Sequence, residues 1–471
     1  MSRYRLLWIW TLVGFIVLGI AALVRTHYWT YGADTGTFAQ LIASTPAGMH
    51  DGVENGSHFR FHWSPSLALL WPLVALTHSA LGLQLVQAAA TVVTAPLLFL
   101  LLRPYVEEQT AYRVGIVSLL YPPLIALGFD EFHELGLFPP VAVAMMLTAD
   151  RMRWWWYALC TLFAIGLRED VSLECIIIGI VLACIGLRPR AKGRGLFELA
   201  PARPRQLAIA GAVTTLVAAG TFAFYSDVVV PHFGGWGPQH FYVYSFARGP
   251  FNVLAAAVLH PVQFAQAIFT VGRLTYVLEA LVPLAFLPLL SWWSLLAVPG
   301  ALIVLLANSG YVWRMGDHYA ALWIPWLLIA AGLGAGKLAQ RRGPQMARNW
   351  TTAAATLCVI FLVAFDPMHP LHYLRPNYHD LADARRALAC VPYDASLSTH
   401  DEWYSAVAAQ RPYATVEQSD GVAYLVYADD VEDERFRTTI YPAVQAEVRD
   451  GRYKAICHYG NVTAYERTNR S

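Results

Sequence analysis

Charged residues are scarce in this sequence. Only 14% of its 471 residues are Asp, Glu, Lys or Arg, whereas 57% are hydrophobic. Because soluble globular chains contain about 25% charged residues, this composition excludes a water-soluble protein and indicates an integral membrane protein. The net charge of +1 provides no basic surface for nucleic acid, so we expect no nucleic-acid partner.

Cysteines are also few. Four of the six lie in apolar segments, where a cysteine is usually a small buried hydrophobic residue, and only Cys390 and Cys457 lie in the polar C-terminal region. An oxidising compartment permits a disulfide between these two residues. The sequence leaves open whether their Cα atoms come within the required distance of about 7 Å.

Long apolar runs dominate the first 365 residues and predict about eleven transmembrane helices. Several runs are shorter than the ~20 residues of a typical span. No convincing cleavage site follows the first run, so we expect it to be retained in the membrane. Ser66–Thr77 is apolar but short, which predicts a partly embedded or re-entrant helix. The runs are residues 6–24, 83–102, 114–128, 137–150, 154–167, 171–187, 206–225, 275–290, 294–308, 319–336 and 350–365.

Lysine and arginine in the short loops predict the orientation of these spans. With eleven spans, the basic loops all fall on one side, including residues 188–205 and 337–348. We therefore place the N-terminus in the cytoplasm. Most acidic and histidine residues near a membrane boundary then fall on the opposite, outer side, in two long loops (25–65 and 225–273) and in short connections between spans.

The first outer loop, residues 25–65, is far longer than the usual 4–6 residues or so of a connection. It carries Asp34, His58 and His62 among aromatic residues, and a long polar loop of this kind is typical of a functional site. A carboxylate just outside the bilayer can accept the proton of an attacking hydroxyl group, which is the role that we predict for Asp34. The alternative is that Asp34 caps a helix that begins there.

Two further polar clusters interrupt the apolar runs. Glu131, His133 and Glu134 lie in FDEFHELG between two spans, and we expect them to position a sugar by hydrogen bonds. The alternative is a divalent cation, Mg²⁺, Mn²⁺ or Ca²⁺, held by these three side chains. The second cluster is Arg168, Glu169 and Asp170, whose arginine is predicted to bind a phosphate, with a structural ion pair as the alternative.

Later outer segments repeat this combination of residues. Arg314, Asp317 and His318 lie together in RMGDHY, and Arg273 follows the outer loop 225–273. A lone arginine at a membrane boundary is usually an anchor whose stem lies along apolar surface. Arginines beside acids and histidine are more typical of a binding site, so we include these four residues among the predicted substrate contacts.

The polar C-terminal region, residues 366–471, predicts a small outer α/β domain that follows the transmembrane domain of residues 1–365. Helical periodicity appears at 380–390. A weaker helix at 432–449 is interrupted by Pro442. Short strands are predicted at 396–398, 423–427 and 453–458.

At these residues the chain resembles a bacterial family of multi-span predicted membrane proteins (DUF2079-like). The family pattern Y-D-x-G-x-F-x-Q departs here at its first position, which is Ala33, and the family's K-E-D has arginine as its first residue. The second change keeps the positive charge. The resemblance covers nearly the whole chain and rests on residues 34–40, 62–65, 131–134, 168–170 and 318–320.

That family is in turn similar to the GT-C superfamily of glycosyltransferases. The resemblance implies an α-helical polytopic enzyme of the bacterial cytoplasmic membrane, which transfers a sugar from a polyprenyl-phosphate carrier to a glycan, lipid or protein acceptor on the outer side. It also implies that Asp34 is the acidic catalytic residue. A transporter or flippase that uses the acids as a proton relay is the alternative; it predicts mid-membrane acids and inverted repeats, and neither is evident in the sequence.

Overall fold

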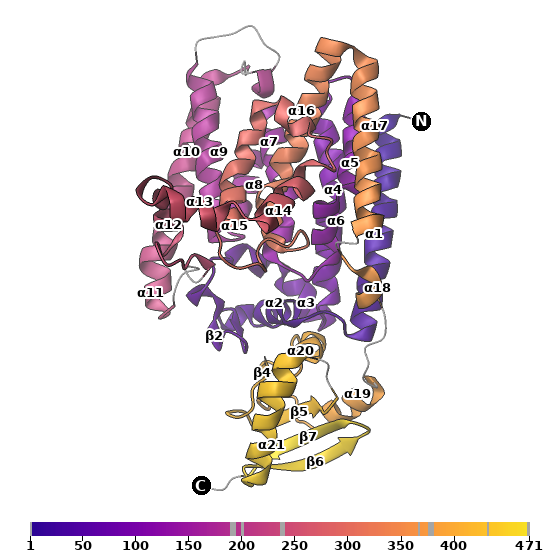
Figure 1. The fold of residues 1–471 in the computed structure, drawn as a ribbon, viewed down its shortest axis with the longest axis vertical. Helices are drawn as coiled ribbons and strands as arrows, with labels where there is room; N and C mark the ends of the chain where they lie inside the picture. Colours follow the sequence, from indigo (N-terminus) through magenta and orange to yellow (C-terminus); the bar gives the residue numbers. More distant parts are fainter. Residues whose placement is uncertain are drawn as a thin grey trace.

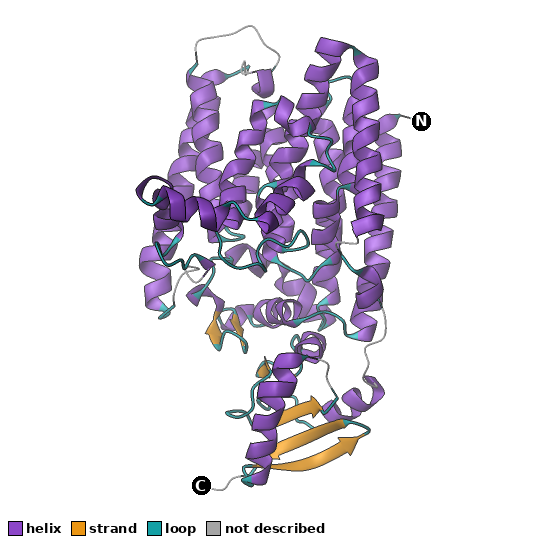
Figure 2. Ribbon diagram, in the orientation of Figure 1, coloured by secondary structure: helices purple, strands orange, loops and turns teal. Residues whose placement is uncertain are grey.

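A computed structural model describes most of the chain: residues 2–188, 195–198, 202–235, 241–365, 368–374, 381–430 and 433–468. The predicted domain boundary at residue 366 and part of the basic loop 188–205 lie outside the described residues. Figure 2 shows a large helical part and a smaller part in which most of the strands gather.

The helical part is a bundle, with the N-terminus near the end that is remote from the strands (Figure 1). We call the opposite end of the bundle, where the strands lie, the sheet-facing end. The main bundle helices are α1 (Arg3–Tyr28), α4 (Leu81–Leu102), α5 (Glu108–Leu120), α6 (Pro122–Phe129), α7 (Phe138–Asp150), α8 (Trp154–Ile165), α9 (Glu169–Leu187), α10 (Pro204–Phe224), α14 (Val271–Leu281), α15 (Val298–Leu305), α16 (Ile324–Arg342) and α17 (Pro344–Ile360).

Fewer helices than expected are both long and apolar enough to cross a membrane. The described residues contain five such helices, or six if α5 and α6, which meet at a bend of 48°, form one span. The sequence predicted eleven. The difference arises because several apolar runs are divided in the structure. The run 294–308, for example, is divided between a 3₁₀ segment, Trp292–Ala297, and the short helix α15, Val298–Leu305.

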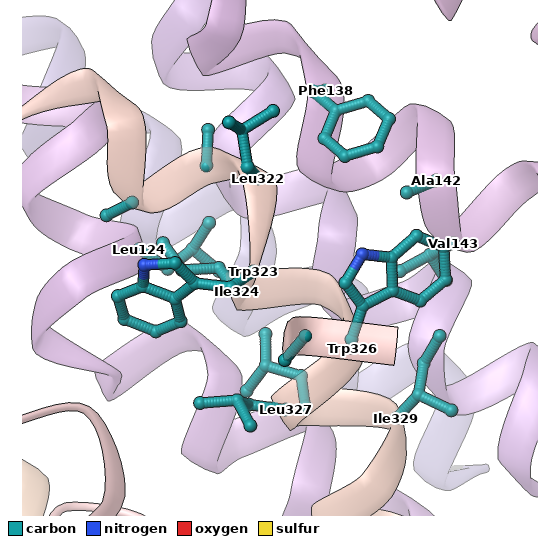
Figure 3. Close-up of a cluster of buried hydrophobic side chains, with 14 of the residues drawn as sticks. Leu124, Phe138, Ala142, Val143, Leu322, Trp323, Ile324, Trp326, Leu327 and Ile329 are labelled. Atoms are coloured by element: carbon teal, nitrogen blue, oxygen red, sulfur yellow. The ribbon is translucent and has the colours of Figure 1, made fainter. Parts of the chain in front are cut away.

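Tryptophans of α16 pack the centre of the bundle (Figure 3). The rings of Trp326 and Phe138 meet edge to face, with centroids 6.4 Å apart. The indole N–H of Trp323 donates to the hydroxyl of Tyr276 at 2.8 Å, so this buried polar atom has a partner. This packing fixes the start of α16 and hence the preceding 3₁₀ segment η10 (His318–Leu322), which carries two residues of the site.

The long first loop is folded into short elements at the sheet-facing end of the bundle (Figure 1). The segment predicted to be partly embedded forms a 3₁₀ turn followed by α3, and Figure 1 shows α2 and α3 between the bundle and the C-terminal strands. The elements of this loop are α2 (Ala33–Ala43), η1 (Thr45–Ala47), the hairpin of β1 (His50–Asp51) and β2 (Gly56–Ser57), η2 (His58–Arg60), η3 (Pro65–Leu70) and α3 (Trp71–Thr77).

The second long loop also contains helices. Within residues 225–273 the structure describes a π-helical turn, η6 (Tyr225–Val229), and then α11 (Val230–His232), α12 (Pro250–Leu259) and α13 (Pro261–Ile268). Residues 236–240 of this loop lie outside the described part.

The C-terminal region forms a five-stranded sheet with strand order β4-β3-β5-β7-β6. β3 pairs in parallel with β4 and β5, whereas β7 pairs antiparallel with β5 and β6. The predicted helix around Pro442 is present, as a π-helical turn, η12 (Phe436–Ile440), that continues directly into α21. The elements are α19 (Leu381–Ala389), β3 (Leu397–Thr399), α20 (Asp401–Val407), β4 (Ala414–Val416), β5 (Tyr424–Ala428), α21 (Tyr441–Arg449), β6 (Tyr453–Tyr459) and β7 (Val462–Arg467).

A disulfide joins Cys390, directly after α19, to Cys457 in β6, with the Cα atoms 6.6 Å apart. The two cysteines that the sequence analysis singled out are therefore bonded in the structure. The bond ties the end of α19 to the edge strand of the sheet.

Candidate active site

Helix α2 presents Asp34 at its N-terminus, next to the bundle. The N-cap of α2 is Gly32, so Asp34 lies within the first turn and is not the capping residue. The Thr35 amide in this turn donates to Glu131 Oε2 at 3.0 Å. The carboxylate of Glu131 therefore satisfies an amide at the start of the helix that has no partner within the helix. Asp34 is not needed to accept that hydrogen bond.

Charged residues from neighbouring segments act electrostatically on Asp34. Burial, together with the nearby Glu134 carboxylate, raises the pKa of Asp34, while Arg168 and His62 act in the opposite direction. A carboxylate with a raised pKa is a stronger base than an exposed aspartate. The structure therefore brings four predicted residues into one electrostatic neighbourhood, although they come from four separate segments of the chain.

His62 and its neighbour are attached to the start of α9. The Nδ1 atom of His62 lies 2.9 Å from Glu169 Oε1, and the Trp63 amide donates to Glu169 Oε2 at 2.9 Å. Both oxygens of this carboxylate are thus used to hold the loop against the bundle. Glu169 therefore orients the ring of His62, and the opposite ring nitrogen remains available for a ligand.

Arg168 lies at the centre of the cluster and is 1% exposed. Its Nε atom lies 3.1 Å from Asp170 Oδ2, and an η-nitrogen donates to the Tyr319 hydroxyl at 3.0 Å. The nearest oxygens of Glu134 and Glu169 lie farther away, at 3.6 and 3.8 Å. Since charge-assisted hydrogen bonds are about 2.7–2.9 Å long, the guanidinium retains donor capacity for a further anionic group.

Two histidines stack face to face beside Arg168. The rings of His133 and His318 are nearly parallel, at 8°, with centroids 3.3 Å apart. His133 Nδ1 lies 2.7 Å from Glu134 Oε2, and His318 Nδ1 lies 3.3 Å from Asp317 Oδ1. Burial, together with the charge of Arg168, lowers the pKa of His133 well below its ordinary value. Both imidazoles are therefore suited to hydrogen bonding as neutral groups.

The predicted metal ligands do not converge on one point. Glu131 binds the start of α2, whereas His133 and Glu134 pair with each other beside Arg168. In the part of the chain that the structure describes, a different group of three residues has the geometry of a cation site. The alternative that Glu131, His133 and Glu134 hold a divalent cation is therefore not supported.

The two remaining arginines differ in their environments. Arg273 donates to the backbone oxygens of Leu305, Ala267 and Ala307 at 2.6–2.7 Å, so its guanidinium anchors a loop and is not directed into the cluster. Arg314 is exposed, and its guanidinium carbon lies 5.6 Å from the ring of Tyr311.

Arg314 lies at the rim of the cluster, since the amide of Asp317, which pairs with His318, donates to the Arg314 carbonyl at 3.0 Å. Burial raises the pKa of Tyr311, and the carboxylates of Asp317 and Asp34 raise it further. The tyrosine therefore lies within the field of the acids that surround the site. Arg314 remains a candidate for an anionic ligand at this rim, whereas Arg273 does not.

Two residues that the sequence analysis did not select, Tyr319 and Gln87, also belong to the site. Tyr319 binds Arg168. The amide of Gln87 in α4 donates to the Glu131 carbonyl at 2.9 Å and accepts from the His133 amide at 2.8 Å. Glu174, one turn beyond Asp170, is fully buried in α9. Gln87 and Glu174 could have been selected from the sequence, because each is a polar residue inside an apolar run.

An apolar groove of about 820 Å³ lies on the side of the bundle. Its lining includes Leu97 and Ala144 of the bundle helices, and it ends at Trp63 and Gly166. Trp63 adjoins His62 in sequence, and Gly166 precedes Arg168 by two residues. The groove and the polar cluster therefore meet at Trp63, whose amide donates to Glu169.

These features define a polytopic membrane protein with a polar site at one end of its helical bundle. Residues 29–454 match the family described as predicted membrane protein (DUF2079). The chain belongs to that family. No curated protein matches the chain in sequence.

Solved structures share the fold at low identity. The crystal structure of ArnT from Cupriavidus metallidurans bound to undecaprenyl phosphate aligns over 98% of this chain and 98% of ArnT. The identity is 11% and the TM-score is 0.55. The apo state aligns over 96% of this chain and 98% of ArnT, at 12% identity with a TM-score of 0.50. The Archaeoglobus fulgidus oligosaccharyltransferase aligns over 98% of this chain and 74% of its own, at 12% identity with a TM-score of 0.43. The fold is thus similar to that of GT-C membrane enzymes.

Proposed function

We propose that this protein is a GT-C-type glycosyltransferase that moves a sugar from a polyprenyl-phosphate carrier to an acceptor on the outer side of the bacterial cytoplasmic membrane. One observation carries the proposal: a lateral apolar groove is lined by Trp63, whose amide donates to Glu169 in the polar cluster that also contains Arg168. The undecaprenyl phosphate bound to ArnT, which has a similar fold, supports a carrier of this chemical class.

The groove suits the lipid part of such a carrier. Its walls are apolar, and side chains along it, such as Leu69, Trp156 and Leu162, are exposed on the flank of the bundle. An isoprenoid chain in the groove would place its phosphate near Trp63 and Arg168. The planar guanidinium then binds phosphate oxygens through its unused donor capacity, and Arg314 is the second candidate cation at the rim.

The chemistry assigned to Asp34 is general base catalysis. Its carboxylate takes the proton of the acceptor hydroxyl, and the acceptor oxygen forms a bond to the anomeric carbon of the sugar. The bond from that carbon to the phosphate oxygen breaks, and its electron pair leaves with the polyprenyl phosphate. Arg168 stabilises the negative charge on this leaving group. A single displacement of this kind inverts the anomeric configuration.

The remaining residues of the cluster line the sugar pocket in this proposal. His62, His133 and Glu134 offer donors and acceptors to sugar hydroxyl groups, while Glu169 and Asp170 hold Arg168 and His62 in place. His318 stacks on His133 and supports its ring from the other side. The acceptor is a glycan, lipid or protein hydroxyl that approaches from the side of the C-terminal sheet.

Mass spectrometry of lipids that co-purify with the full-length protein tests the proposal. We expect polyprenyl phosphate to accompany the wild type, to be lost in Arg168→Ala, and to be retained in part by Arg168→Lys, which keeps the charge. Arg151→Ala, which changes an exposed arginine outside the cluster, is the matched control. Equal lipid content in wild type and Arg168→Ala would contradict the assignment of Arg168.

A further inference from the structure

The loop between α1 and η3 contains a second polar group, separate from Arg168. Asp51 ends β1, Glu54 lies in the following turn, and His58 begins η2. Each of these residues offers one ligand atom, and the three atoms all lie within 4.8 Å of one another. In the described part of the chain, this is the group of His, Cys, Asp and Glu residues that meets the geometric requirement of a cation site.

This group contains one buried carboxyl group, that of Asp51, and one partly buried carboxyl group, that of Glu54. Asp51 is 4% exposed, and its Oδ1 atom accepts from the amides of Val53, at 3.0 Å, and Glu54, at 2.8 Å. Its other oxygen, Oδ2, is buried and receives no hydrogen bond from any described residue. One oxygen of Asp51 and one oxygen of Glu54 lie within 4.8 Å of each other. Two carboxylates at such a distance repel each other unless a proton or a cation lies between them.

The one nitrogen ligand comes from His58, which is 1% exposed. Its Nδ1 atom lies 2.9 Å from Glu54 Oε2, and its Nε2 atom has no partner among the residues that the structure describes. The nearby Arg60 donates to the Asn55 carbonyl at 3.2 Å, and it forms no ion pair with a described carboxylate. The guanidinium of Arg60 is thus bonded to the backbone, and no described lysine or arginine forms an ion pair with Asp51 or Glu54.

We propose that Asp51, Glu54 and His58 bind a divalent transition-metal ion, Zn²⁺ or Mn²⁺. Carboxylate oxygens and an imidazole nitrogen are ligands for either ion, whereas Mg²⁺ and Ca²⁺ favour sites made of oxygen alone. Three protein ligands leave coordination positions for water, as in many zinc sites. The cation would balance the charges of the Asp51 and Glu54 carboxylates, and one ring nitrogen of His58, Nδ1 or Nε2, would be its nitrogen ligand.

The position of the site indicates what the ion does. It would tie β1, the turn and η2 together. The His62 amide donates to the His58 carbonyl at 3.0 Å, so the ligand His58 and the site residue His62 lie on one turn of chain. The ring of Phe38 lies between the metal group and the cluster and contacts both His58 and His133. We therefore assign the ion a positioning role for His62, outside the reacting atoms.

Metal binding to the tag-free, full-length protein in detergent tests this inference directly. After the protein is stripped with a chelator, it is titrated with Zn²⁺ or Mn²⁺ in a calorimeter, and its metal content is measured by inductively coupled plasma mass spectrometry. We expect one ion per chain and much weaker binding of Mg²⁺. Asp51→Asn and His58→Gln are expected to weaken Zn²⁺ binding at least about 10-fold, the lower end of what a supporting residue contributes.

Asp394→Asn, which changes an exposed aspartate of the C-terminal region, is the matched control and is expected to bind the ion like the wild type. Failure of the wild type to take up one equivalent of Zn²⁺ or Mn²⁺ overturns the inference without reference to any variant. Binding by Asp51→Asn and His58→Gln at wild-type affinity overturns it as well. Neither result bears on glycosyl transfer, since the readout is the bound metal and not activity.

Discussion

The hydroxyl of Tyr404 in α20 donates to Gln40 Oε1 in α2 at 2.9 Å, although 364 residues separate the two in sequence. The same oxygen accepts from the Gly52 amide at 2.7 Å, and Gln40 Nε2 donates to the carbonyls of Arg411 and Ala414, at 2.8 and 3.1 Å. One amide side chain thus joins α2, the following loop and the C-terminal region. The helix that carries Asp34 is held in place by residues from the other end of the chain.

Gln40→Ala is expected to loosen this junction. The substitution removes four hydrogen bonds at once, and a buried polar group that loses its partner costs about 1–3 kcal/mol. We therefore expect a lower melting temperature of the detergent-solubilised protein and faster proteolysis between the bundle and the C-terminal region. Gln345→Ala, which alters an exposed glutamine of α17, serves as the control, and equal melting of the two variants would contradict the role of Gln40.

Asp34→Asn is expected to abolish sugar transfer while polyprenyl phosphate still binds. An amide cannot accept the acceptor's proton, and general base catalysis contributes about 10²–10⁴-fold to rate. Because Asp34 does not cap α2, the melting temperature should change little. Transfer is measured by mass spectrometry of products from a panel of polyprenyl-phosphate sugars. Full activity of this variant in the presence of a donor that the wild type uses would remove Asp34 from the mechanism.

Ala144→Trp is expected to fill the lateral groove and reduce the polyprenyl phosphate that co-purifies with the protein. Ala144 lines the groove on α7, so an indole there occupies the volume that the isoprenoid chain needs while leaving Arg168 unchanged. Leu216→Trp places the same side chain on an exposed position of α10, and this variant should retain lipid. If both variants carry as much lipid as the wild type, the carrier enters by another route.

Removal of the disulfide should destabilise the C-terminal region. Cys390 and Cys457 enclose a separation of 67 residues, and a disulfide of this kind typically contributes about 2–4 kcal/mol by restricting the unfolded chain. Cys390→Ser with Cys457→Ser is therefore expected to increase proteolysis of residues 381–468 in the full-length protein. Cys160→Ser, at a free cysteine of α8, should have no such effect. A reductant should increase proteolysis of the wild type but not of the double variant.

Local patterns in the sequence were sufficient for much of the architecture. Long apolar runs indicate a membrane protein, because such segments are more stable in lipid than in water. The few charged residues between them mark the segments that are candidates for a functional site. The helix expected at 380–390 and the strands expected at 396–398, 423–427 and 453–458 correspond to α19, β3, β5 and β6. The short strands β4 and β7 were not predicted, since their pairing depends on partners distant in sequence.

The sequence by itself determined which residues are chemically able to form the site, because acids, arginines and histidines are costly in an apolar chain and so stand out. Tertiary structure decided which of them meet. It stacked His133 on His318, directed Arg273 to backbone carbonyls, and placed Asp51 beside His58. Such contacts depend on the relative positions of helices and loops, which long-range packing sets and no local spacing in the chain encodes.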